Sequence, residues 1–201
     1  GNKFFKGIKP GSALDFDNIV PRIPAGSEGR VTINSKGQLV FDKTPKKTIS
    51  FRSCAFPFRI CKTTKDIDDL ISLLCLQGYN MVRFHGVLEK LSKNKYCKFG
   101  VTIDNAKFIP QTKDDFEKYF DKQKLKLFEY LLYQLGKHVI YVYIDVMTRF
   151  TGFTDATQSG HWIGKDLLAQ QFHAQLYVNP AFRRNWKQGI TYILNHTNSF
   201  N

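Results

Sequence analysis

Two basic residues stand where a short apolar stretch of the chain ends. Residues 78–82 (GYNMV) are typical of a helix stop that leads into a buried strand, and Arg83 and His85 follow directly. Side chains two residues apart on a strand point to the same face, so we expect Arg83 and His85 to share one surface. Binding and catalytic side chains collect at the C-terminal ends of strands in parallel α/β sheets. The sequence therefore predicts a binding site at this strand end.

A second strand, expected over residues 139–146, brings an acidic residue to the same site. One face of it is aliphatic and should pack against helices, whereas the other face carries Tyr141, Tyr143 and Asp145. This division is typical of a barrel strand, in which the mixed face lines the lumen. We expect Asp145 to face the same interior as Arg83 and His85. There it acts as a catalytic carboxylate or holds one of the two basic side chains in place.

The elements expected around these residues form repeated strand–helix units. Strands are expected over residues 49–58, 79–85 and 139–146. A helix capped by Thr64 and stopped by Gly78 should precede the second strand, because apolar residues recur at helical spacing between them. Further helices are expected over residues 125–136 and from residue 179 to about residue 193. Two long segments, residues 88–111 and 147–178, read as loops at the functional end of the sheet.

The expected fold class is α/β, a partial (β/α)8 barrel preceded by an N-terminal β-hairpin. Residues 1–48 form an extended segment and a hairpin, with strands at 29–33 and 38–41 and a further turn at 42–47. Residues 49–201 supply about the first three strand–helix units of the barrel. Three parallel strands leave a sheet edge open, so we expect the remainder of the barrel, or a second copy of the chain, to cover that edge.

Composition limits the classes of partner. The chain has 201 residues, with 30 Lys and Arg against 17 Asp and Glu, a net charge of +13 that favours an anionic partner or a solvated Lys-rich surface. Recognition signatures for specific nucleic-acid binding are absent from the sequence, as is any apolar run long enough to span a membrane. The four cysteines have no metal-site spacing, and we expect buried free thiols in preference to disulfides, with their redox state left open. No cofactor or metal is expected.

The run at residues 78–85 resembles the second strand of cellulase-like glycoside hydrolases of family 5 and clan A, which reads Gly-aromatic-Asn-x-Val-Arg. Residues 125–145 resemble the third helix–strand unit of that family. The hairpin at residues 29–41 resembles a segment that precedes or plugs the barrel bottom in some members, and residues 193–198 resemble the connection into their fourth strand. The resemblance covers roughly residues 25 to 201.

This resemblance implies a retaining β-glycoside hydrolase that acts on a β-linked oligo- or polysaccharide with a pair of glutamates. In the family these glutamates end the fourth and seventh strands, so neither catalytic residue is expected in this chain, which should be inactive alone. Arg83 matches the family arginine that steadies the nucleophile carboxylate. The family often has a histidine just past the third strand, where this chain has Asp145 and Val146. An extracellular or cell-envelope location is expected.

Each site residue also has a structural alternative. Arg83 could pair with an acidic neighbour, and His85 could be a polar lumen residue. Trp162, beside His161 in the long segment 147–178, could stack on a sugar ring or anchor its loop. The alternative function is a non-catalytic module that binds carbohydrate or a polyanion. The sequence leaves the sugar and its linkage open.

Overall fold

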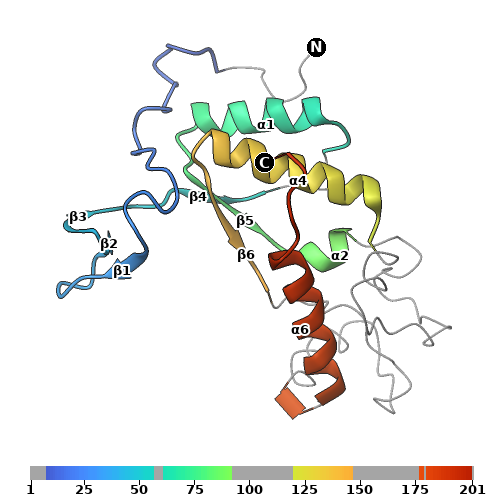
Figure 1. The fold of residues 1–201 in the computed structure, drawn as a ribbon. Coiled ribbons are helices and arrows are strands. Elements are labelled where there is room, and N and C mark those ends of the chain that lie inside the picture. The colour runs from blue at the N-terminus through green and yellow to red at the C-terminus, as the bar shows by residue number, and fades with distance from the viewer. Residues whose placement is uncertain (1–7, 57–60, 92–119, 147–176, 179, 201) are drawn as a thin grey trace, which may run out of the picture. The chain divides into compact units, whose positions relative to one another are not determined.

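The computed structural model describes residues 8–56, 61–91, 120–146, 177–178 and 180–200 (Figure 1). The fold is mixed α/β, with two three-stranded sheets and helices α1, α2, α4 and α6. The chain divides into two compact units. Unit 1 comprises Gly1–Phe84, Tyr130–Tyr143 and Phe200–Asn201, and unit 2 comprises His85–Glu129 and Ile144–Ser199.

The first sheet of unit 1 is antiparallel and has the order β1-β2-β3. It consists of β1 (Val31–Ile33), β2 (Leu39–Phe41) and β3 (Thr44–Thr48). The predicted hairpin is confirmed, since the Asn34 side chain accepts the backbone N–H groups of Lys36 and Gln38 and Gly37 has a φ of 75°. The turn predicted at residues 42–47 is confirmed at Asp42 and Lys43, whereas residues 44–48 form β3, in which Thr44 pairs with Phe41 and Thr48 with Val40 across a register shift.

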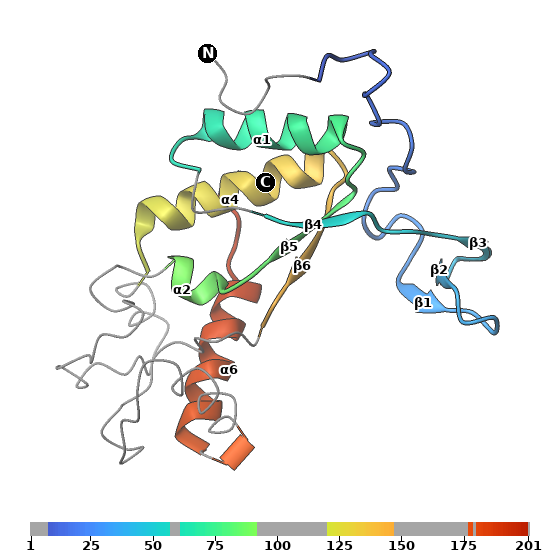
Figure 2. The same ribbon diagram turned by 180° about the vertical axis from the view of Figure 1, so that it is seen from behind.

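The second sheet has the order β4-β5-β6 and carries the predicted strand ends. Its strands are β4 (Ser53–Ala55), β5 (Met81–Phe84) and β6 (Tyr141–Ile144), and β4 pairs with β5 in parallel. In the sequence, α1 (Thr64–Leu76) lies between β4 and β5, and α4 (Lys122–Lys137) lies between β5 and β6. Helix α4 begins in unit 2 and ends in unit 1. Within unit 1, α1 and the end of α4 lie side by side in both views (Figures 1 and 2), and Tyr130 of α4 donates a hydrogen bond to Asp68 of α1 over 2.8 Å.

Helix α1 begins and ends on side-chain signals close to those expected. Its N-cap is Thr63 rather than Thr64, and Thr63 forms a capping box with Asp66. The prediction was wrong by one residue because both threonines suit the position and only the reciprocal bond with Asp66 selects between them. The predicted stop is confirmed, since Gly78 has a φ of 72° and satisfies the last turn from the left-handed region.

The core of unit 1 forms where α1 and α4 meet the second sheet. The buried side chains of α1 are those at the predicted helical spacing, and in β5 Val82 and Phe84 are buried whereas Arg83 is exposed, as predicted from strand parity. The corresponding prediction for residues 139–146 is confirmed only in part, since Ile140 is buried whereas Val142 is 36% exposed and Val146 is 41% exposed. The physical reason for Val142 is that β6 ends the strand order of its sheet, with one neighbouring strand among the described residues.

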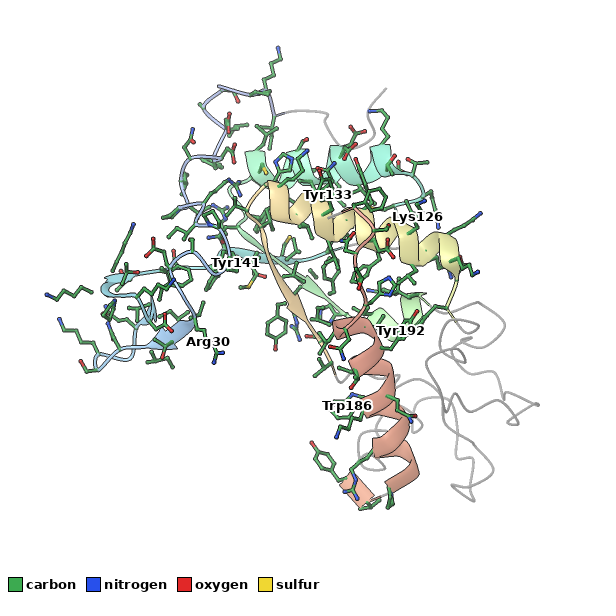
Figure 3. All side chains as sticks on the ribbon, in the orientation of Figure 1. Arg30, Lys126, Tyr133, Tyr141, Trp186 and Tyr192 are labelled. Carbon is green, nitrogen blue, oxygen red and sulfur yellow. The ribbon has the colours of Figure 1, made fainter. Side chains whose placement is uncertain are left out.

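Within unit 1, hydrogen bonds hold the N-terminal segment against the residues before β5 and the start of β6. The Arg22 guanidinium pairs with Asp17 at 2.5 Å and donates to the backbone carbonyls of Tyr79 and His138. The hydroxyl of Tyr141, labelled in Figure 3, donates to the carbonyl of Ile23 over 2.8 Å. These bonds satisfy carbonyls near the ends of two helices and fix the segment that enters the first sheet.

Unit 2 contains α2 (Val87–Leu91), the first half of α4 and α6 (Pro180–Leu194). Helix α6 starts at the predicted proline, whose missing N–H is no loss in a first helical turn. From α6, Tyr192 stacks on Phe120 with ring centroids 5.2 Å apart, and Trp186 donates its indole N–H to the carbonyl of Val146 over 2.5 Å (Figure 3). The segment expected as a loop from residue 88 begins with the last four residues of α2.

Candidate functional site

Asn80 of the predicted motif positions the two strands that lead to the site. Its side chain is buried, accepts the backbone N–H of Arg52 at 2.8 Å and donates to the carbonyl of Ser50 at 3.0 Å. The Asn80 carbonyl accepts the backbone N–H of Tyr141 at 2.8 Å. One residue therefore ties the start of β5 to the segment before β4 and to β6. Sequence reasoning placed Asn80 in the motif and did not predict this structural role.

The residues that directly follow β5 and β6 meet in unit 2. His85 comes next after β5 and Asp145 next after β6, and the Nδ1 of His85 lies against the Oδ2 of Asp145, a contact that is an ion pair only when the ring is protonated. The Asp145 side chain is 9% exposed and the His85 side chain is 47% exposed. A largely buried carboxylate thus contacts one nitrogen of a ring that is about half exposed.

Arg83 lies two residues before His85 and makes its own contact within unit 1. The guanidinium carbon of Arg83 lies 5.5 Å from the centre of the Tyr143 ring, within cation–π range. Arg83 is exposed and Tyr143 is 53% exposed, so both offer surface to a ligand. A guanidinium fork and an aromatic face together suit a ligand that has hydroxyl or carboxylate oxygens and an apolar face.

The two remaining predicted site residues lie outside the described residues. Trp162 and His161 fall in residues 147–176, and their proposed contact with a sugar stays a prediction. Of the five predicted site residues, the structure thus pairs His85 with Asp145 and places Arg83 against a tyrosine that shares a strand face with Asp145 in the sequence.

A second polar cluster of unit 2 was not predicted. The Glu129 side chain of α4 is buried, and its Oε1 lies 2.6 Å from the Nε2 of His196. Its Oε2 accepts the hydroxyl and, at 3.3 Å, the backbone N–H of Ser199, while the Glu129 carbonyl accepts the Asn198 side chain at 2.8 Å. We call these four residues the Glu129 clasp. The one feature of the sequence that could have indicated this cluster is a glutamate next to Phe128, on the apolar side of the predicted helix.

The electrostatics of the clasp favour an ionised carboxylate. Burial raises the pKa of Glu129, but hydrogen bonds from His196 and Ser199 outweigh it and leave the pKa below its ordinary value. The carboxylate stands between the hydroxyl and the imidazole. A nucleophilic serine needs its hydroxyl on a base that a third group orients, so this order is not that of a serine hydrolase. The clasp is best interpreted as a structural device that holds the chain after α6.

The described cysteines are free thiols of low reactivity. Burial raises the pKa of Cys61 to about 11 and also raises the pKa of Cys54 and of Cys75. Thiols with raised pKa values stay protonated at neutral pH and are poor nucleophiles and poor metal ligands. Cys97 lies outside the described residues.

The part of the chain that the structure describes contains neither a metal-binding cluster nor a membrane-spanning helix. In those residues, no group of three or more histidines, cysteines and acidic residues is placed to hold a metal ion. None of the described helices combines the length and the apolar character needed to cross a membrane.

Comparison of the chain with protein-family models, with curated proteins and with solved structures found no match. The resemblance to family 5 glycoside hydrolases therefore rests on the sequence motifs at residues 78–85 and 125–145.

Proposed function

We propose that this chain is the N-terminal portion of a retaining β-glycoside hydrolase and that it supplies one wall of a carbohydrate site. The observation that carries the proposal is the His85–Asp145 pair, which joins the residues that directly follow β5 and β6. In parallel α/β folds, polar side chains at the C-terminal ends of neighbouring strands mark the functional end of the sheet.

The strand order supports a partial (β/α)8 barrel as the finer fold. β4, β5 and β6 are neighbours in chain order, β4 is parallel to β5, and helices separate the successive strands in the sequence. This order is expected of a barrel, in which each strand lies next to the one before it. The first half of a doubly wound sheet has the same order, and the resemblance at residues 78–85 and 125–145 is what favours the barrel in this proposal.

In this proposal Arg83 steadies the catalytic nucleophile, and His85 contacts a sugar hydroxyl. The exposed guanidinium can donate two parallel hydrogen bonds to a carboxylate, which an ammonium group cannot reproduce. The two catalytic glutamates would be supplied by sequence that follows Asn201. The 201-residue chain by itself is then expected to bind sugar weakly and to hydrolyse nothing.

The experiment that tests the proposal is to express the coding sequence extended by about a hundred residues or more, enough to complete a barrel of about 250 residues. We expect an Asn-Glu pair near the end of the next strand and a second Glu later in the barrel. The product formed first from a β-linked oligosaccharide should keep the β configuration when followed by NMR. A reading frame that continues without either glutamate would contradict the proposal.

Two variants connect the activity to this chain. In the extended enzyme, Arg83→Lys should lower kcat about tenfold to a hundredfold, because it removes part of a charge-assisted interaction worth about 1.5–3 kcal/mol. Lys126→Arg, a change of cation on the exposed side of α4, is the matched control and should leave kcat unchanged. Turnover by the 201-residue chain that survives Arg83→Lys and further purification would contradict the assignment.

The polyanion-binding alternative is separated by the same purified chain. The net charge of +13 is the observation that favours it. Saturable binding of heparin without any binding of neutral β-linked hexasaccharides would support that alternative against the proposal.

A further inference from the structure

The His85–Asp145 pair has a consequence for which ligand atoms the site can accept. The Asp145 side chain is 9% exposed and contacts the Nδ1 of His85, whereas the His85 ring is 47% exposed. The contact involves the nitrogen nearer the backbone. The contact occupies Nδ1, so a ligand that meets this half-exposed ring is recognised through the second nitrogen, Nε2.

The chemistry of the pair decides which nitrogen of a neutral His85 ring carries the proton. An ionised carboxylate is an acceptor only, so the nitrogen that faces it must donate. With the proton on Nδ1, the Nε2 of a neutral imidazole has a lone pair and is a hydrogen-bond acceptor. The partner of one ring nitrogen thus determines whether the other nitrogen carries a proton.

We infer that Asp145 is a positioning residue that fixes His85 as an acceptor at Nε2, and that the ligand atom it receives is a hydroxyl donor of a neutral sugar. This inference rests on the proposed function and deepens it. An acceptor nitrogen matches a sugar O–H, which can donate one bond and still accept another. It does not match a sulfate or carboxylate oxygen, which needs a donor. At Nε2 the pair accordingly favours a sugar hydroxyl over an acidic oxygen.

The tautomer can be measured without any ligand. Two-bond ¹H–¹⁵N correlation spectra of ¹⁵N-histidine-labelled protein at pH 8 separate a protonated from an unprotonated ring nitrogen. The chain has five histidines, and the resonances lost in His85→Gln identify those of His85. We expect an Nδ1–H ring with an unprotonated Nε2 in the wild type. In Asp145→Ala the proton should move substantially toward Nε2, with other histidine signals unchanged.

Two further variants keep the measurement interpretable. Asp145→Asn has the shape of the native residue and can still accept through its amide oxygen, so it should retain more of the Nδ1–H form than Asp145→Ala does. Asp69→Asn, which removes the partly buried carboxylate that pairs with Lys65 at 3.1 Å, is the control and should leave the His85 signals unchanged.

The ligand part is tested by titrating the same samples with neutral β-linked hexasaccharides. Asp145→Ala and His85→Gln should each weaken binding about tenfold, the loss of one hydrogen bond. A wild-type ring protonated at Nε2 overturns the inference, and if sugar still binds, the proposed function stands without it. An Nδ1–H ring in a chain that binds no neutral sugar overturns the ligand assignment together with the proposed function.

Discussion

The Glu129 clasp gives the sharpest stability prediction, and the perturbation is Glu129→Gln. Glutamine keeps the size of the side chain but replaces one carboxylate oxygen with an amide that donates. The carboxylate now accepts from His196 at 2.6 Å and from Ser199 by two groups. In the variant the new side-chain amide donates, so a donor of His196 or Ser199 faces another donor. Position 129 is only 8% exposed in the native protein, so water cannot readily replace the lost acceptor.

The expected loss follows from the number and kind of bonds removed. A hydrogen bond to a charged group contributes about 1.5–3 kcal/mol, so Glu129→Gln should reduce the free energy of unfolding by about 2 kcal/mol. Removal of one partner from a buried pair costs about 3–5 kcal/mol, and because Ser199 is exposed we expect Glu129→Ala near the lower value, about 3 kcal/mol. A loss of about 2 kcal/mol corresponds to a fall in melting temperature of about 4–8 °C for a chain of this size.

The pH dependence provides an independent readout of the same residue. The folded pKa of Glu129 lies below its ordinary value of 4.5, so the unfolded chain takes up this proton more readily than the folded chain does. The stabilisation is therefore fully present above the ordinary pKa and is lost as pH falls through the folded pKa. The difference between wild type and Glu129→Gln should shrink as pH falls from about 5 to about 3.

The assay is urea unfolding followed by tryptophan fluorescence, since Trp186 lies in the same unit as the clasp. Glu28→Gln, which removes a carboxylate from the loop before β1, is the matched charge control and should change stability by less than about 0.5 kcal/mol. A Glu129→Gln protein as stable as the control, with an unchanged pH dependence, would refute the reasoning.

Three further predictions concern the elements that lead to the site, each measured by urea unfolding. Asn80→Ala orphans two backbone groups before β4 and should cost about 2 kcal/mol, whereas an effect near zero would remove its positioning role. Gly78→Ala places a Cβ 2.7 Å from a backbone oxygen at a φ of 72° and should cost more than about 1 kcal/mol, while Gly136→Ala, with no atom within 4 Å of the added carbon, should stabilise α4 by about 0.5–1 kcal/mol. Thr63→Ala should cost about 1 kcal/mol and Thr64→Ala much less, and the opposite order would restore the predicted cap.

The elements that local signals specify were predicted from the sequence. Helix α1 has its buried residues at helical spacing and a glycine stop, and α4 was expected over residues 125–136 against the observed Lys122–Lys137. These signals act between residues three or four positions apart, so the sequence of the helix alone contains them. The alternation of buried and exposed side chains along β5 was predicted for the same reason, since successive side chains of a strand point to opposite faces.

Strand lengths and edges were predicted less well. The strand expected over residues 49–58 is observed as the three residues of β4, and the turn expected at 42–47 contains most of β3. A strand is defined by its partner, which lies elsewhere in the chain, and a register shift such as that in β2 has no local sequence signal. The same dependence explains why the covered face expected for residues 139–146 is exposed at Val142.

The sequence by itself determined that Arg83 and His85 stand at the end of a strand and that Asp145 stands at the end of another, because strand parity is a local property. Only the tertiary structure decided the pairings: His85 with Asp145, Arg83 with Tyr143, and Glu129 with His196 across 67 residues of sequence. Hydrogen bonds and ion pairs act over a few ångströms, and which distant residues come that close depends on how the whole chain packs.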